Sequence, residues 1–190
     1  GRSFFRAAKA AGADIDFVAV NDLGSIEQMA HLLRYDSVLG KLDTKVTTTS
    51  SSIKVGGDTV KVLSERDPSD LPWGDLGVDV VIESTGFFNS RDAASAHLTG
   101  GAKLVIVSAP CSGADATYVY GVNHKDFRVS QHQVVSAASC TTNCFVPMVK
   151  VLDDAFGVVN GLMTTIHSYT GDQNLVDAPH KDPRRSRAAA

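Results

Sequence analysis

Short apolar runs alternate along the chain with amphipathic helical stretches, and this alternation constrains the fold more than any other feature of the sequence. The apolar runs have the length of buried strands and lie at residues 15–20, 78–82, 104–107 and 134–135. The helical stretches have apolar residues at helical spacing and lie at residues 2–11, 25–34, 91–98 and 139–156. Repeated strand and helix units favour right-handed crossovers, so an α/β fold with a doubly wound parallel sheet is predicted.

Residues 44–63 interrupt this alternation. They contain short runs of β-branched residues around Gly56, Gly57 and Asp58, which is the signal of a hairpin. An antiparallel excursion is therefore expected between the parallel strands. The last helical stretch contains Pro147, which cannot donate a backbone hydrogen bond, so a kink or a loosened first turn is expected there.

Composition and charge exclude several classes of protein. The chain has 43% hydrophobic and 21% charged residues with a formal net charge of −3, so binding to nucleic acid or to an anionic membrane is not indicated. No apolar run approaches the roughly 18 residues that cross a bilayer, and the amino terminus has no signal-peptide pattern. A cytoplasmic protein is therefore expected.

Three cysteines, Cys111, Cys140 and Cys144, are too few for a disulfide framework. A zinc site needs four ligands and Cys111 has no CxxC partner, so no metal is predicted. Cys144 lies about one helical turn after Cys140 and is expected to pack against the sheet. Cys111 follows Pro110 and is interpreted as a loop thiol.

The start of the chain matches the back half of a dinucleotide-binding unit. Gly1 precedes a predicted helix, a strand follows, and Asp22 stands at the end of that strand. In such a Rossmann-type unit the pyrophosphate lies on the helix amino terminus, and an acidic residue about 20 positions further on binds the ribose hydroxyls. The first strand of the unit is missing from the sequence. Because an aspartate at a strand end is more often a turn or cap residue, this match alone leaves both interpretations open.

Cys140 has the clearest chemical setting. It lies between Ser139 and Thr141 at the start of a predicted helix, where unpaired backbone N–H groups and the helix dipole favour a thiolate. The same N–H groups can stabilise negative charge on a carbonyl oxygen that the sulfur attacks. An isolated cysteine is more often a small buried hydrophobe, but the polar neighbours of Cys140 favour a nucleophile.

His167 lies in residues 162–170, whose alternation of side chains predicts a strand. It is either a structural residue or the base that deprotonates Cys140, and sequence spacing cannot choose between these roles. The other histidines are expected at the surface, and they are His31, His97, His124, His132 and His180.

The hexapeptide Ser139-Cys140-Thr141-Thr142-Asn143-Cys144, followed later by His167, is similar to the active site of the glyceraldehyde-3-phosphate dehydrogenases. Supporting matches run through the whole chain, at residues 1–2, 20–22, 35–38, 65–68, 84–86, 107–110, 121–123 and 167–170. The resemblance implies an NAD-dependent oxidoreductase of glycolysis.

The resemblance also implies a mechanism. Cys140 would attack the aldehyde of glyceraldehyde 3-phosphate, and hydride would pass to NAD. Inorganic phosphate would then release the resulting thioester as 1,3-bisphosphoglycerate. His167 would raise the thiolate population and take the hydroxyl proton as the hydride leaves.

Seven residues would have binding roles if the resemblance holds. Phosphate groups of the substrate and of the attacking phosphate would be held by Ser139, Thr141, Thr170 and Arg185. The cofactor would be bound by Asp22 at the adenosine ribose and by Arg66 and Ser108 along the cleft.

NAD is the expected cofactor. Leu23 after Asp22, together with Pro179, is similar to the NAD-using members, whereas Ala178 departs from the leucine that is common in them. The carboxylate of Asp22 would also repel the 2′-phosphate of NADP. Residues 172–187 resemble part of a loop that reaches a neighbouring subunit, so the resemblance implies a homotetramer.

Two domains are expected. Residues 1–139 would form the NAD-binding domain, incomplete at its amino terminus, and residues 140–190 would begin a mixed α+β catalytic domain, truncated at its carboxyl terminus. The 190-residue chain by itself is expected to have no dehydrogenase activity, because the incomplete sheet exposes apolar surface. Three alternatives stay open: an erythrose-4-phosphate dehydrogenase, a cofactor-free Cys/His acyl hydrolase, and a non-catalytic binding protein.

Overall fold

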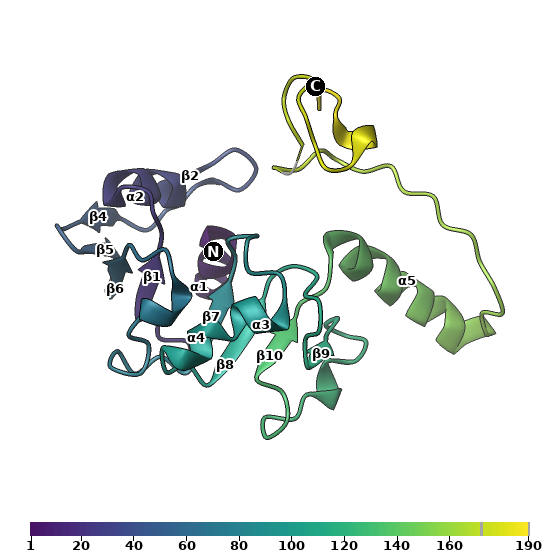
Figure 1. Cartoon of the computed structure of the whole chain (residues 1–190), viewed down its shortest axis with the longest axis horizontal. Helices are drawn as coiled ribbons and strands as arrows, with labels where there is room; N and C mark the ends of the chain where they lie inside the picture. Colours follow the sequence, from purple (N-terminus) through teal and green to yellow (C-terminus); the bar gives the residue numbers. More distant parts are fainter. Residues whose placement is uncertain (172, 190) are drawn as a thin grey trace. The chain divides into compact units, whose positions relative to one another are not determined.

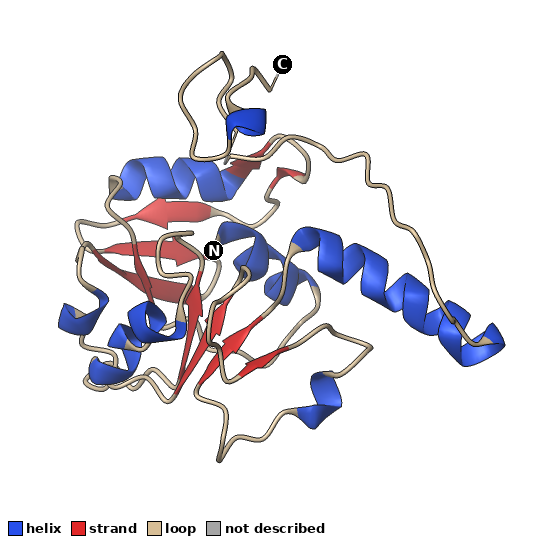
Figure 2. Ribbon diagram, turned by 45° about the vertical axis from the view of Figure 1, so that its right-hand side comes forward, coloured by secondary structure: helices blue, strands red, loops and turns tan. Residues whose placement is uncertain are grey.

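The structure is a computed structural model, and it describes residues 1–171 and 173–189 (Figure 1). The chain divides into two compact units, Gly1–Asp154 and Ala155–Ala190. The first unit contains all the strands of the described chain, and Figure 2 shows them in red with helices in blue beside them.

The first sheet has the strand order β1-β6-β5-β4. It is built from β1 (Ala19–Asn21), β4 (Val46–Thr48), β5 (Ser52–Val55) and β6 (Asp58–Leu63). β1 pairs in parallel with β6, whereas β4, β5 and β6 pair in antiparallel fashion. The predicted hairpin is confirmed, because Val55 pairs with Asp58 across the turn at Gly56 and Gly57.

The second sheet is parallel throughout and has the order β7-β8-β10-β9. It is built from β7 (Val80–Glu83), β8 (Leu104–Val107), β9 (Ala116–Thr117) and β10 (Val134–Ser136). A small antiparallel pair, β2 (Tyr35–Asp36) with β3 (Gly40–Lys41), completes the strands. The predicted α/β fold with a Rossmann-type parallel sheet is confirmed.

The two sheets are separated at the position that the first strand has in a Rossmann sheet. A Rossmann sheet has the strand order 3-2-1-4-5-6. β6 and β1 take places 3 and 2, and β7, β8 and β10 take places 4 to 6. Place 1 falls between β1 and β7, and no strand of the described residues occupies it. The two sheets still share apolar contacts, because Ala19 and Leu63 pack against a buried cluster that contains Val81.

The helices follow the sequence pattern closely near their ends. α1 (Arg2–Ala10) stops where Gly12 takes a φ of 60° and its N–H donates to the carbonyl of Lys9 at 3.1 Å. α2 (Ile26–Arg34) begins with a capping box between Ser25 and Gln28. Both helices lie where the spacing of their apolar residues predicted them.

The helix predicted at residues 91–98 is divided in two. α3 (Arg91–Ala94) and α4 (Ala96–Thr99) meet at Ser95, whose hydroxyl donates to the carbonyl of Arg91 at 2.6 Å. A serine hydroxyl that bonds to the carbonyl four residues earlier competes with the helical ladder and bends it. Short 3₁₀ turns lie at Pro68–Asp70, His124–Asp126 and Pro183–Arg185.

α5 (Cys140–Phe156) continues through Pro147 without an interruption. It leads away from the sheet after its first turn (Figure 1). None of its side chains is buried. The expectation that Cys144 packs against the sheet was therefore wrong, since this thiol is exposed.

The strand predicted at residues 162–170 was also wrong. Residues 157–170 have no regular secondary structure, and Leu162 and Ile166 are fully exposed. A strand requires a neighbour for its ladder of hydrogen bonds. Within the described part of the chain, this segment pairs with no other strand. No helix in that part is long and apolar enough to cross a membrane.

A close backbone contact makes Gly101 difficult to replace. A Cβ atom at Gly101 would lie 2.6 Å from both Cα and N of Gly74, and Gly101 has a φ of 103°. We therefore expect Gly101→Ala to lower the free energy of unfolding by about 2–3 kcal/mol. Urea denaturation measures this loss. Gly57→Ala is the matched control, because a Cβ there meets no atom within 4 Å, and an equal loss in this control would contradict the argument.

Asp115 ties α3 to the amino end of β10. One of its oxygens lies 2.6 Å from Nε of Arg91, and the other accepts the N–H groups of Gln133 and Val134 at 2.8 and 2.9 Å. Burial alone would raise the pKa of Asp115, but these donors lower it from 3.8 to about 2. A depressed carboxyl pKa stabilises the fold above the unfolded value, and this stability is lost as pH falls through the folded value.

We expect Asp115→Asn to cost about 1 kcal/mol at neutral pH, after allowance for solvent screening. The difference from the unchanged protein should shrink as pH falls from about 4 toward 2. Thermal denaturation across this range tests it. Asp79→Asn removes an ion pair to Lys103 of the same 2.6 Å length, but with Asp79 68% exposed, so it should cost under about 0.5 kcal/mol. A pH-independent loss at Asp115 would refute the linkage.

Candidate active site

The residues predicted to bind a cofactor lie at the carboxyl ends of parallel strands. Asp22 directly follows β1, and its N–H donates to the carbonyl of Leu63 at 3.1 Å. Its exposed carboxylate accepts the N–H of Gly24 at 2.8 Å, which makes a local turn. Arg66 follows β6 and is exposed. Ligands of open α/β sheets bind at this edge.

Ser108 follows β8 at the same kind of edge. Its N–H donates to the carbonyl of Glu83 at 2.9 Å, and its hydroxyl donates to the hydroxyl of Ser84 at 3.2 Å. β7 and β8 pair in parallel up to Glu83 and Val107, so Ser84 and Ser108 leave the sheet together. Both residues are exposed.

The start of α1 lies near these strand ends. The carboxylates of Glu83 and Asp22 both interact electrostatically with Gly1, which precedes this helix. Asp22 belongs to the first sheet and Glu83 to the second, so the amino terminus of α1 is within electrostatic reach of both. Backbone N–H groups at such a helix start can bind a pyrophosphate.

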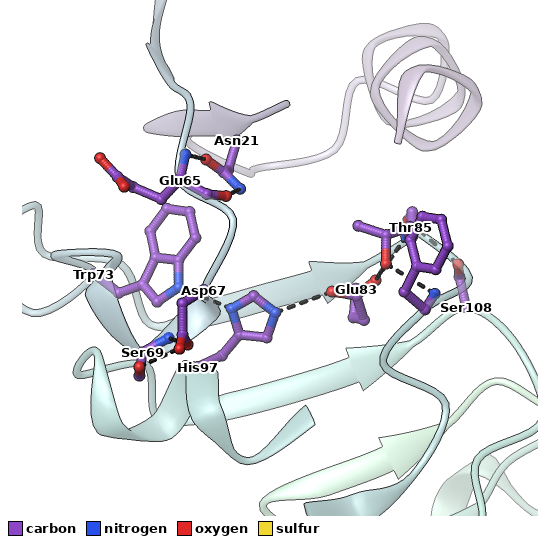
Figure 3. A network of polar contacts seen from close by, with 11 residues as sticks. Asn21, Glu65, Asp67, Ser69, Trp73, Glu83, Thr85, His97 and Ser108 are labelled. Atoms are coloured by element: carbon purple, nitrogen blue, oxygen red, sulfur yellow. Dashed lines mark hydrogen bonds and ion pairs between the residues drawn. The ribbon is translucent and has the colours of Figure 1, made fainter. Parts of the chain in front are cut away.

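The side-chain amide of Asn21 holds the backbone of Glu65, the residue directly before Arg66. The side chain of Asn21 donates to the carbonyl of Glu65 at 2.9 Å and accepts the N–H of Glu65 at 2.8 Å (Figure 3). This double contact joins the ends of β1 and β6. The sequence motifs contained both residues, but their pairing across 44 positions could not be read from them.

Cys140 stands on a tight turn between β10 and α5. Ser136 is the last residue of β10, and its buried hydroxyl donates to the carbonyl of Ala109 at 2.7 Å and accepts the N–H of Ala138 at 3.0 Å. Ala138 is buried and has a φ of 61°, a left-handed conformation that costs a non-glycine residue about 1 kcal/mol. The turn therefore has a specific, strained shape.

Ser139 caps the helix that follows. Its hydroxyl oxygen accepts the N–H of Thr142 at 3.0 Å and shares a hydrogen bond of 2.7 Å with the Thr142 hydroxyl. The side chain of Asn143 donates back to the carbonyls of Ala137 and Ser139. Cys140 is consequently the first helical residue, as the sequence predicted, and its thiol is exposed. Thr141 beside it is half-buried.

The remaining predicted residues belong to the second unit. His167 is exposed, and its Nδ1 lies 2.6 Å from the carbonyl oxygen of Ser168, so Nδ1 carries a proton in this arrangement. The N–H of Thr170 donates to the side chain of Gln173 at 2.9 Å. Arg185 ends the 3₁₀ turn Pro183–Arg185. Cys140 belongs to the first unit and His167 to the second, so the approach of His167 to Cys140 stays a prediction.

A cavity of about 490 Å³ lies beside the turn that carries Cys140. It is lined by Asn89, Pro110, Cys111, Ser112, Thr117, Ser136, Ala138, Ser139 and Thr142. Burial raises the pKa of the Cys111 thiol, and Asp115 raises it further. Cys111 is therefore held as a neutral thiol, unlike a nucleophile.

Comparison with known proteins identifies the family. Residues 1–91 match the model of the glyceraldehyde 3-phosphate dehydrogenase NAD binding domain, and residues 139–190 match the model of its C-terminal domain. The whole chain is 58% identical to glyceraldehyde-3-phosphate dehydrogenase 2 of Streptomyces avermitilis, 57% to the enzyme of Streptomyces coelicolor and 53% to glyceraldehyde-3-phosphate dehydrogenase 1 of Bacillus subtilis. The chain belongs to the glyceraldehyde-3-phosphate dehydrogenase family. It spans 57%, 56% and 56% of the lengths of these relatives.

One part of this family member was not predicted from its sequence. His97 was expected at the surface, but it is 5% exposed and lies between Trp73 and Glu83 (Figure 3). The prediction failed because burial of a single residue on a short helix depends on partners far away in the sequence. Among the described residues, no group of three or more His, Cys, Asp or Glu could hold a metal ion.

Proposed function

We propose that the whole protein oxidises glyceraldehyde 3-phosphate to 1,3-bisphosphoglycerate with NAD and inorganic phosphate. One observation carries the proposal: Cys140 is the first residue of a capped helix that follows the carboxyl end of β10, and Asp22 and Ser108 follow the carboxyl ends of β1 and β8. A helix start favours a thiolate, and backbone N–H groups in such a place can stabilise an oxyanion. The family membership supports the same chemistry.

The edge of the sheets fits a dinucleotide. Asp22 offers an exposed carboxylate to ribose hydroxyls, and the start of α1 offers N–H groups to a pyrophosphate. Arg66 and Ser108 line the same edge. When bound, NAD supplies a hydride acceptor. The carboxylate of Asp22 would repel an added 2′-phosphate, which favours NAD over NADP.

The protein's own residues supply the covalent chemistry. The Cys140 sulfur forms a bond to the aldehyde carbon, and His167 removes the hydroxyl proton as the carbon is oxidised. Inorganic phosphate then attacks the thioester, the carbon–sulfur bond breaks, and the Cys140 thiolate returns. Phosphate groups are held by Ser139, Thr141, Thr170 and Arg185.

Three features of the whole protein belong to the same proposal. It has an NAD-binding domain that includes residues 1–139 and a catalytic domain that includes residues 140–190. It acts in glycolysis in the cytoplasm. It assembles as a homotetramer in which residues 172–187 approach a neighbouring subunit.

NADH formation by the purified whole protein tests the function. We expect turnover of glyceraldehyde 3-phosphate that requires both NAD and phosphate. Preferred turnover of erythrose 4-phosphate without phosphate would favour that dehydrogenase instead. Hydrolysis of an ester substrate without NAD, together with no heat of NAD binding in calorimetry, would overturn the proposal in favour of an acyl hydrolase.

A further inference from the structure

A series of buried hydrogen bonds between side chains ends at the carboxyl end of β7. Nε1 of Trp73 lies 3.1 Å from Nδ1 of His97, and Nε2 of His97 lies 3.0 Å from Oε2 of Glu83. The side chains of His97 and Glu83 are only 6% and 3% exposed. Oε1 of Glu83 accepts both the N–H and the hydroxyl of Thr85, at 2.6 and 2.5 Å (Figure 3).

The indole of Trp73 determines which nitrogen of His97 accepts a hydrogen bond and which donates one. An indole N–H can only donate, so Nδ1 of His97 must accept and carries no proton. The neutral ring then has its proton on Nε2 and donates it to Glu83. Glu83 must therefore accept from His97 at one oxygen and from Thr85 at the other.

A carboxylate at position 83 satisfies all of these hydrogen bonds, whereas a carboxamide of the same size does not. Burial alone would raise the pKa of Glu83, but hydrogen bonds from His97 and Thr85 bring it below its ordinary value. A carboxamide has one acceptor oxygen and one NH₂ donor. Its NH₂ group would face either the Nε2–H of His97 or the donors of Thr85, and Trp73 prevents the ring from changing its tautomer.

The contacts fix the turn that follows β7. Thr85 in turn accepts the N–H of Phe87 at 3.1 Å, and Gly86 has a φ of 81°. Ser84, on the other side of Thr85, accepts the hydroxyl of Ser108. The turn at residues 84–86 is exposed, and its shape depends on a side chain that is buried beneath it.

We propose that Glu83 is a positioning residue for the NAD cleft, which holds the turn at residues 84–86 in the shape that receives the cofactor. Glu83 itself does not touch the cofactor and acts through Thr85. His97, which accepts a hydrogen bond from Trp73, holds the other oxygen of the carboxylate in place. This inference rests on the proposed function, because it assumes that NAD binds at this edge.

The Glu83→Gln variant of the whole protein tests the role. Calorimetry should show NAD binding weakened by about tenfold, because one hydrogen bond to a charged group is lost beneath the turn. The KM for NAD should rise in parallel. The KM for glyceraldehyde 3-phosphate and the alkylation rate of Cys140 should stay within about twofold of the unchanged protein.

Asp115→Asn is the matched control. Asp115 is likewise a carboxylate whose pKa is lowered by its hydrogen-bond donors, but its two backbone N–H donors belong to Gln133 and Val134 at the amino end of β10, the opposite edge of the sheet. It should lower stability without changing the NAD dissociation constant. If Glu83→Gln likewise lowers the melting temperature and leaves NAD binding within twofold, Glu83 is only structural and the inference is overturned.

Thr85→Val keeps the inference testable if Glu83→Gln does not fold. It removes the hydroxyl donor and keeps the backbone N–H, so NAD binding should weaken by about threefold. Unchanged binding would count against Glu83 acting through Thr85. Where Glu83→Gln does fold, the two losses in the double variant should be less than multiplicative, because both substitutions act on the hydrogen bonds between Glu83 and Thr85. Absence of NAD binding by the unchanged protein would instead overturn the proposed function.

Discussion

The Cys140→Ser variant of the whole protein should form NADH from glyceraldehyde 3-phosphate at least about 10⁴-fold more slowly than the unchanged protein. Cys140 is the first residue of α5, where the Ser139 cap and the helix start favour a thiolate. These groups do not supply enough stabilisation to ionise a serine hydroxyl. The thioester step would therefore have no nucleophile.

Single-turnover formation of NADH measures this loss. Cys144→Ser is the control, since Cys144 is an exposed thiol on the same helix but one turn further from its start. It should retain activity within about twofold. Activity of Cys140→Ser above a tenth of the unchanged protein, or an equal loss in Cys144→Ser, would show that Cys140 is not the nucleophile.

The His167→Asn variant should lower kcat by about 10²- to 10⁴-fold, the usual contribution of a positioned general base. Asparagine keeps much of the polarity of the ring but cannot take a proton near neutral pH. The rate of the unchanged protein should rise with pH as the imidazole loses its proton and becomes able to accept one. This rise should be absent in the variant.

The pH profile separates a base from a structural histidine. His31→Asn changes an exposed histidine on α2 and should leave both the rate and its pH profile unaltered. The alkylation of Cys140 by iodoacetamide should also slow in His167→Asn, because the ring raises the thiolate population. A uniform loss of rate that keeps the rise with pH would assign His167 a structural role only.

The fold was predictable where the signal is local. The apolar stripes of α1 and α2 and the apolar run at β8 all lie within the elements that they specify. The strand predicted around His167 failed for the opposite reason. Alternating polar and apolar side chains give a segment two faces. Only a neighbouring strand provides the partners for its backbone hydrogen bonds.

The candidate site was likewise predictable only where the signal is local. The setting of Cys140 could be predicted because the helix start and its hydroxyl neighbours are adjacent in sequence. The burial of His97 could not, because Trp73 and Glu83 lie 24 and 14 positions away and reach it only through the packing of the sheet. Which side chains contact each other depends on the tertiary fold, and the periodicity of the sequence does not reveal it.

The conformation of Ala138 limits which residues evolution can place before the reactive cysteine. Its φ of 61° excludes β-branched side chains, and its 7% exposure excludes long or charged ones. Small, unbranched side chains such as those of alanine and serine remain, together with glycine. A search of genome sequences for chains with this turn can therefore reject candidates with valine, isoleucine or lysine two positions before the cysteine, even where every chemically active residue is present.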